Sequence, residues 1–148
     1  VLAGDLHILF NDIVQAGGTI SGVLVQCPDP HWKSKHRKRR ILGLKFINTC
    51  QEFAEGGFLL VRTDVQPVIN DISYLVRNYG MHPEDEASNA LAMQLCQIPT
   101  ERMIYVRRKG GVVHSKIFRI RRDQQRANLA SDALLNVDDL EPLFGFYD

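Results

Sequence analysis

The 148-residue chain has little that would tie it to a membrane or to an oxidising environment. It contains no apolar run of the roughly 18 residues that a membrane-spanning helix needs, so we expect no membrane partner. Its three cysteines, Cys27, Cys50 and Cys96, are odd in number and far apart, as is typical of reduced thiols. We therefore expect an intracellular, reducing location, with cytoplasm, nucleus and organelle left open.

Two further features are missing at the start of the chain. Neither an initiator methionine nor a signal peptide stands at Val1, which predicts that the chain begins inside a longer protein. No G-x-G-x-x-G motif and no Walker A lysine is present, and turns explain the three glycine pairs. If the protein is a cofactor enzyme, we expect its cofactor loop to lie upstream of Val1.

The sequence also argues against two common kinds of site. Cys27, His31 and His36 offer metal-ligand chemistry, but there is no C-x-x-C pair and no helical H-x-x-x-H. No nucleophile-elbow sequence supports a serine triad either. The prediction is that the protein has no metal site and no serine nucleophile.

The formal net charge of +1 hides an uneven distribution. Residues 123–148 contain six acids against Arg126, a net charge of −5, so the other 122 residues carry +6. The segment 33–40 alone contains six lysines and arginines. A dense basic patch in a nearly neutral chain indicates a local binding site for a polyanion.

Hydrophobic periodicity predicts alternating helices and strands. Apolar residues at helical spacing predict helices near the amino terminus, over 41–55 and over 65–79, and a short helix within 87–96. Apolar, β-branched runs predict buried strands over 20–27 and 58–63. Two further strands, over 103–108 and 112–121, are predicted to form a hairpin around Lys109-Gly110-Gly111.

Strands separated by helices predict an α/β fold with a parallel sheet and a terminal antiparallel hairpin. In such sheets, ligands bind beyond the carboxyl ends of the strands. Asp29 and Asp64 each follow a predicted strand, so we expect both carboxylates at one edge of the sheet. Two other interpretations stay open, because Asp29 between two prolines is also typical of a turn and Asp64 of a helix N-cap.

The basic segment follows the first of these strands. Trp32 and two histidines alternate with the cations, which offers aromatic faces for bases together with charges for phosphates. The alternatives are a solvated helix start and a nuclear localisation signal. Its position between a buried strand and a helix favours an RNA-binding surface.

Several motifs resemble the tRNA (guanine-N7)-methyltransferases. Pro28-Asp29-Pro30-His31-Trp32-Lys33, followed by His36-Arg37-Lys38-Arg39-Arg40, resembles that family's signature, and His31 is more similar to eukaryotic members. Thr63-Asp64 resembles the family's Thr/Ser-Asp motif. Pro99-Thr100-Glu101-Arg102 resembles its carboxyl-terminal Thr-Glu segment.

The resemblance covers residues 1–122 and implies the carboxyl-terminal part of a class I methyltransferase domain. It implies a partial Rossmann-like sheet, with S-adenosylmethionine as cofactor and N7 of a variable-loop guanine in tRNA as methyl acceptor. An accessory protein subunit is a further candidate partner. Residues 123–148 are expected to be a weakly structured acidic tail.

The same resemblance implies roles for individual residues. Asp29 would be the catalytic residue, and Asp29 and Thr100 would contact the cofactor. Lys33, Asp64, Thr100 and Arg102 would bind the substrate. The residues expected to bind tRNA are Lys35, His36, Arg37, Lys38, Arg39 and Arg40.

The chain also departs from the family pattern. The amino-terminal half with its glycine loop is absent, Cys27 stands where Phe is usual, and a second acid expected near Arg102 or Met103 is missing. The chain alone is therefore expected to bind the cofactor poorly and to be inactive. A non-catalytic RNA-binding module related to the family is the alternative function.

Overall fold

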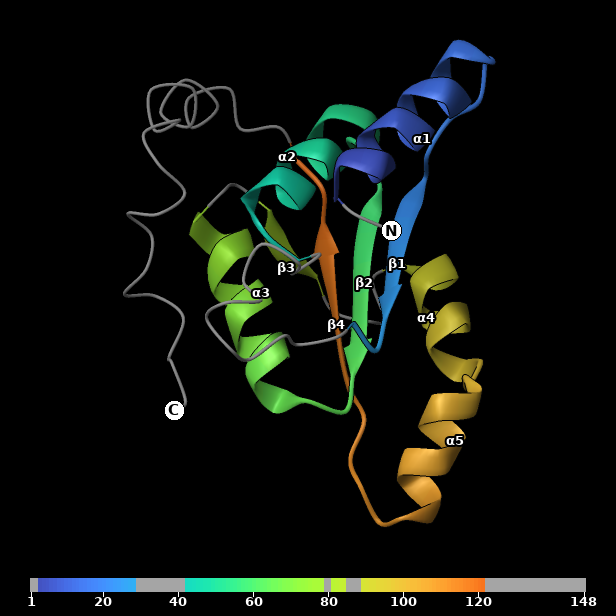
Figure 1. Ribbon diagram of the computed structural model, residues 1–148, viewed down its shortest axis with the longest axis vertical. Coiled ribbons are helices and arrows are strands. Elements are labelled where there is room, and N and C mark those ends of the chain that lie inside the picture. The colour runs from blue at the N-terminus through green and yellow to red at the C-terminus, as the bar shows by residue number, and fades with distance from the viewer. Residues whose placement is uncertain (1–2, 29–41, 79–80, 85–88, 122–148) are drawn as a thin grey trace.

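A four-stranded sheet forms the centre of the computed structural model, which describes residues 3–28, 42–78, 81–84 and 89–121 (Figure 1). The strand order is β1-β2-β4-β3. The four strands are β1 (Gly22–Gln26), β2 (Phe58–Thr63), β3 (His82–Glu84) and β4 (His114–Arg119).

The sheet is mixed. β1 and β2 run parallel, with Gln26 opposite Arg62, which confirms the predicted parallel pair. β4 runs antiparallel to both β2 and β3. Because a parallel pair needs a crossover, a helix lies between β1 and β2 in the sequence, as the periodicity predicted.

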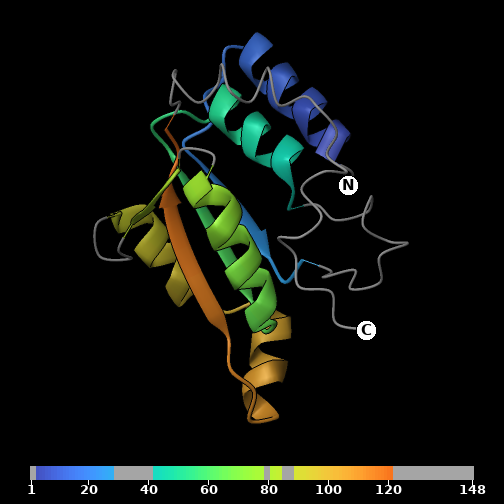
Figure 2. The ribbon, with the colours of Figure 1, turned by 90° about the vertical axis from the view of Figure 1, so that its left-hand side faces the viewer.

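Helices lie on both sides of the sheet, and Figure 2 shows α3 and α4 on opposite sides of β4. The predicted helices are confirmed, and Gly17 and Gly56, with φ of 82° and 80°, adopt the left-handed conformation that follows α1 and α2. The helices are α1 (Ala3–Gln15), α2 (Leu44–Phe53), α3 (Gln66–Asn78), α4 (Ala90–Gln97) and α5 (Glu101–Arg108).

The predicted hairpin is wrong, because its first half is α5. Thr100 caps this helix, Glu101 lies in its first turn, and Gly110 follows it with φ of 77°. Met103 and Val106, three residues apart, are buried, whereas Ile104 and Tyr105 between them are exposed. A short run of apolar residues before Lys109-Gly110-Gly111 is compatible with a strand, but the capping residues favour a helix.

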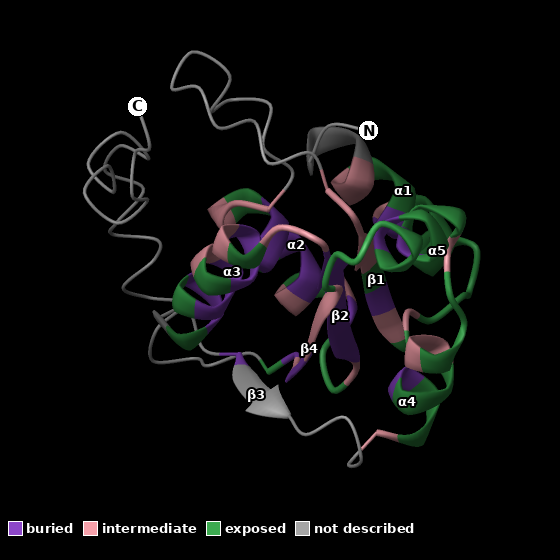
Figure 3. Cartoon of the chain, turned by 90° about the horizontal axis from the view of Figure 1, so that it is seen from below, coloured by how far each residue is buried: buried purple, intermediate pink, exposed green. Residues whose placement is uncertain are grey.

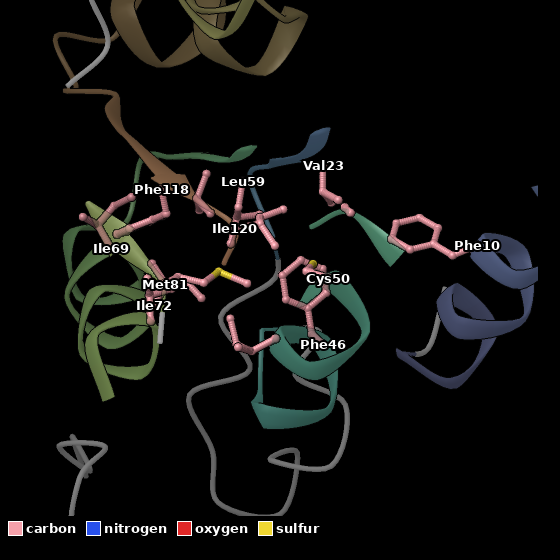
Figure 4. Close-up of a cluster of buried hydrophobic side chains, with 14 residues drawn as sticks. Phe10, Val23, Phe46, Cys50, Leu59, Ile69, Ile72, Met81, Phe118 and Ile120 are labelled. Atoms are coloured by element: carbon pink, nitrogen blue, oxygen red, sulfur yellow. The ribbon is translucent and has the colours of Figure 1, made fainter. Parts of the chain in front are cut away.

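Alternation along β2 divides the apolar core between the two faces of the sheet. Leu59 and Val61 join the larger cluster with α1, α2 and α3 (Figure 4), whereas Phe58 and Leu60 pack with Ala92 of α4. All six residues of β2 are buried, and Figure 3 shows the strand surrounded by the other elements. β2 therefore provides a rigid base for the residues at its end.

Two predictions concern residues outside the described part of the chain. They concern the basic segment together with Asp29, and the acidic tail. What was expected of their structure therefore stays a prediction. Within the described residues, none of the helices has the length and hydrophobicity to span a bilayer.

Candidate functional site

The carboxyl ends of β1 and β2 lie side by side. The backbone N–H of Cys27, directly after β1, donates a hydrogen bond to the carbonyl oxygen of Arg62 at 2.7 Å. Asp64 follows directly after β2. The two strands thus end at one edge of the sheet, as predicted, whereas Asp29 is outside the described residues and its proximity to Asp64 stays a prediction.

Asp64 forms an ion pair across this edge with Arg102 of α5. The Nη2 atom of Arg102 donates to Oδ2 of Asp64 at 2.6 Å, and the two side chains are 56% and 17% exposed. This hydrogen bond and the negative charge of Asp64 raise the pKa of Arg102 above its ordinary value. The resemblance implies a substrate-binding role for both residues, and the fold brings them together although they are 38 positions apart in the sequence.

The carboxylate of Asp64 therefore points to α5. The hydroxyl of Thr63, the preceding residue, accepts a hydrogen bond just before α3 begins. Oγ1 of Thr63 accepts a hydrogen bond from the backbone N–H of Val65 at 3.1 Å. Thr63 is fully buried, so this turn is rigidly attached to the sheet. Asp64 therefore lies between this buried turn and α5, where its carboxylate pairs with Arg102.

Cys27 lies beside this ion pair in an unusual conformation. Its φ of 44° is in the left-handed region, which non-glycine residues seldom adopt and which is more frequent at functional sites. Burial and the negative charge of Asp64 raise the pKa of the Cys27 thiol, while the charges of Arg102 and Arg62 oppose this shift. The thiol is consequently neutral at physiological pH.

Thr100 serves as the N-cap of α5. Its Oγ1 accepts a hydrogen bond from the backbone N–H of Met103 at 3.3 Å. The hydroxyl proton is still able to donate to a ligand, because accepting a hydrogen bond leaves it unused. Met103 is fully buried in the core, so it does not replace the missing second acid at the site.

A residue that the sequence analysis did not single out, Arg62, is the most completely buried cation of the described chain, with 1% exposure. Its guanidinium donates hydrogen bonds to the backbone carbonyl oxygens of Leu95, Cys96 and Ile98. An arginine within an otherwise apolar strand was the signal in the sequence, since arginine is seldom buried without a specific partner.

Two buried polar atoms near this position have no hydrogen-bond partner in the described part of the chain. They are Nε of Arg62 and Oε1 of Gln26. The two residues are register partners in a parallel pair, so their side chains are on the same face of the sheet. One atom is a donor and the other an acceptor, which makes this face polar at the end of β1 and β2.

Helix α5 extends the positive charge away from the ion pair. The Cζ atom of Arg102 and the Nζ atom of Lys109 are each 6.0 Å from the ring centroid of Tyr105. Tyr105 is 55% exposed, and Arg107 and Arg108 complete the basic carboxyl-terminal turn. The exposed ring among cations resembles the predicted chemistry of the basic segment.

Lys33 and the six predicted RNA-binding residues lie outside the described part of the chain, so their roles stay predictions. Among the described residues, no group of three or more His, Cys, Asp and Glu side chains is arranged to hold a metal ion. The described site therefore consists of an acid, an arginine, a threonine and a neutral thiol at one sheet edge.

Comparison with known proteins defines the class. A family model described as "Putative methyltransferase" matches residues 1–116. The match includes both strand ends and the Asp64–Arg102 pair. The chain belongs to this methyltransferase family.

Individual relatives have a more specific name. Relatives from Synechococcus sp. (strain WH7803) and Prochlorococcus marinus (strain MIT 9303) are 33% and 31% identical over 127 and 112 residues. A third, from Microcystis aeruginosa, is 25% identical over 100 residues. All three are named tRNA (guanine-N(7)-)-methyltransferase.

Coverage differs between the chain and these relatives. The alignments include 78%, 74% and 67% of this chain but 54%, 47% and 47% of the relatives, in the same order. The chain thus spans about half the length of the curated relatives that it matches.

Proposed function

We propose that the protein containing this chain transfers a methyl group from S-adenosylmethionine to N7 of a variable-loop guanine in tRNA. The observation that supports this most directly is the pairing of Asp64 with Arg102 beside the end of β1, where the motif Pro28-Asp29-Pro30 begins. The family match and the names of the relatives support the same reaction. In this proposal the sheet is the carboxyl-terminal half of a Rossmann-like methyltransferase sheet.

The chemistry requires mainly positioning. The N7 atom of guanine has a free lone pair, so no general base is needed to expose it. The enzyme must align that lone pair with the reactive methyl group, which is an orientation effect. Methylation places positive charge on the purine, and a fixed carboxylate at Asp29 would stabilise that charge as it develops.

The remaining residues would hold the substrate. Asp64 accepts hydrogen bonds from the base or from Arg102, and Arg102 and Lys33 bind phosphate or the guanine carbonyl. Thr100 donates its hydroxyl proton. The surface that contacts the tRNA backbone would consist of residues 35–40, extended by the cations and Tyr105 of α5.

The described residues provide only part of what S-adenosylmethionine requires. The carboxylate of Asp64 suits the positive charge of the cofactor, but its charge is already paired with Arg102. No glycine-rich turn follows any of the four strands that the structure describes. We therefore assign the cofactor mainly to residues outside this chain, with Asp29 and Thr100 as its contacts here, and we assign substrate positioning to this chain.

A non-catalytic RNA-binding module is the second candidate function. The observation that favours it is Arg102, a cation that pairs with Asp64 near the position where a second acid is expected. A protein of this kind would keep the basic surface and bind tRNA without methylating it.

Methylation by the full-length protein separates the two functions. We expect methyl incorporation at one guanine of a tRNA transcript, and we expect Asp29→Ala to abolish it while tRNA binding stays largely intact. Asp12→Ala, an exposed acid of α1, is the matched control and should be fully active. Full activity of Asp29→Ala would remove Asp29 from the mechanism, and binding without any methylation by the unmodified protein would favour the second function.

A combined replacement of Arg37, Lys38 and Arg39 tests the RNA surface. We expect weaker tRNA binding with a lower salt dependence, by about one unit of log–log slope for each lost phosphate contact. The same assay on Arg77→Ala, on the α3 surface, should show the slope of the unmodified protein. An unchanged slope in the triple variant would show that tRNA binds elsewhere.

A further inference from the structure

Arg62 attaches α4 to the end of β2. Its Nη1 atom donates to the carbonyl oxygens of Leu95 at 2.9 Å and Ile98 at 2.8 Å, and its Nη2 atom donates to that of Cys96 at 3.0 Å. All three hydrogen bonds go to the backbone at the last turn of α4 rather than to a carboxylate. The guanidinium therefore recognises a helix end.

This arrangement explains how the cation is tolerated at 1% exposure. A buried charge costs free energy unless it is well hydrogen-bonded. The last carbonyl groups of a helix have no partner within the helix, and together they carry partial negative charge. The two terminal nitrogens of the Arg62 guanidinium thus find acceptors at the end of α4, while its Nε atom has no partner among the described residues.

This attachment fixes the position of the segment that contains the candidate substrate residues. Ile98, the last of the three carbonyl partners, is two residues before Thr100 and four before Arg102. Arg102 in turn reaches back to Asp64, two residues after Arg62. The end of β2 therefore holds the segment between α4 and α5 at two points, one through Arg62 and one through Asp64.

The two points differ in exposure. The Arg62 guanidinium is enclosed by protein, whereas the Arg102 side chain is 56% exposed and its pair with Asp64 is open to solvent. Exposed ion pairs exchange readily and contribute little to stability. Of the two attachments, the buried one is therefore the more persistent, and the exposed pair is the one that is able to open.

We propose that Arg62 is a positioning residue that fixes Thr100 and Arg102 at the sheet edge, so that Arg102 can leave Asp64 for an anionic substrate group without displacing α5. The anionic group is a backbone phosphate of RNA. This part rests on the proposed function, whereas the positioning of residues 98–105 does not.

The test uses the full-length protein and the variants Arg62→Met and Arg62→Lys. Methionine keeps most of the side-chain length but has no donor. Lysine keeps the charge and three donors but lacks the planar guanidinium that reaches all three carbonyls. Arg77→Met is the control, because it removes an exposed arginine near the end of α3 on the other face of the sheet.

Amide hydrogen exchange provides a measurement that is independent of activity. In Arg62→Met we expect amides of residues 98–105 to exchange about tenfold faster, while amides of β2 and β4 stay protected. Arg62→Lys should be intermediate, and Arg77→Met unchanged. Unchanged exchange at 98–105 in Arg62→Met overturns the proposal. If this variant loses protection throughout the sheet, Arg62→Lys decides, since faster exchange confined to 98–105 supports the proposal and any other pattern overturns it.

Steady-state kinetics test the connection to substrate. We expect Arg62→Met to raise the KM for tRNA about tenfold with a much smaller change in kcat, because contacts that position the substrate are lost. A fall in kcat at unchanged KM would contradict the proposed role. If the unmodified protein does not methylate tRNA, the proposed function fails, and hydrogen exchange still decides whether Arg62 positions the segment.

Discussion

Arg102 of α5 and Asp64, directly after β2, meet at 2.6 Å although they are 38 positions apart in the sequence. The pair closes the edge of the sheet beside Cys27. Because Asp64 is mostly shielded and Arg102 is mostly exposed, the arginine is the member that is able to move toward a ligand.

The first prediction concerns this pair. We expect Asp64→Asn to change thermal stability very little, because the pair is open to solvent on the Arg102 side, but to weaken tRNA methylation strongly. Melting curves and methylation kinetics of the full-length protein measure the two effects. Asp12→Asn removes an exposed acid of α1 and is the matched control. A large loss of stability in Asp64→Asn would assign a structural role to the pair.

The second prediction concerns the N-cap of α5. Thr100→Ala removes the acceptor for the N–H of Met103 and should lower the free energy of unfolding by about 1 kcal/mol, measured by urea denaturation. Thr100→Ser keeps the acceptor and should retain most of this stability. Equal stability of all three proteins would show that the cap is not formed in solution.

Thr100→Ser also separates stability from binding, because serine keeps the hydroxyl proton that is proposed to contact the ligand. We expect tRNA methylation by this variant to stay within about threefold of the unmodified protein, and that of Thr100→Ala to fall further than its stability explains. Equal methylation by both variants would assign Thr100 a capping role alone.

The third prediction follows from Cys50 in the core of α2. Burial raises the pKa of its thiol to about 12, so the folded protein keeps this proton at a pH where the unfolded chain has lost it. The unfolded state then binds fewer protons, and stability falls as pH rises above about 9. The contribution is about 1.4 kcal/mol for each pH unit within that range.

Cys50→Ala should therefore show a flatter fall of unfolding free energy between about pH 9 and 11 than the unmodified protein, despite lower stability at neutral pH. Denaturant curves at several pH values measure the slope. Cys96→Ala, at a half-buried position, is the control. Parallel slopes in the Cys50→Ala and unmodified proteins would contradict the prediction.

The fourth prediction uses Cys27 to report on the charges at the sheet edge. The negative charge of Asp64 raises the pKa of the Cys27 thiol, and that of Arg102 lowers it. Asp64→Asn should thus shift the pH dependence of iodoacetamide labelling at Cys27 to lower pH, and Arg102→Met to higher pH. Mass spectrometry of the peptide that contains Cys27 measures both shifts. Identical pH profiles of labelling in the variants and the unmodified protein would show that these charges do not affect the pKa of the thiol.

Much of the fold was predictable because local patterns determine it. The segments 58–63 and 20–27, which contain β2 and β1, are apolar and β-branched, and the α3 segment has one apolar face. The predicted strand over 103–108 is wrong, because a short run of apolar residues is compatible with a strand or a helix, and the capping hydroxyl of Thr100 is the stronger local signal.

The sequence by itself determined the family of this protein, since its motifs are contiguous and the chemistry of residues 28–40 can be interpreted without coordinates. It also determined that β1 and β2 end at the same edge, because parallel strands joined by a helix must do so. Only the tertiary structure decided that Asp64 pairs with Arg102 and that Arg62 holds the end of α4. Both contacts join residues more than 30 positions apart, and no local pattern specifies which distant carbonyl or guanidinium will meet a given side chain.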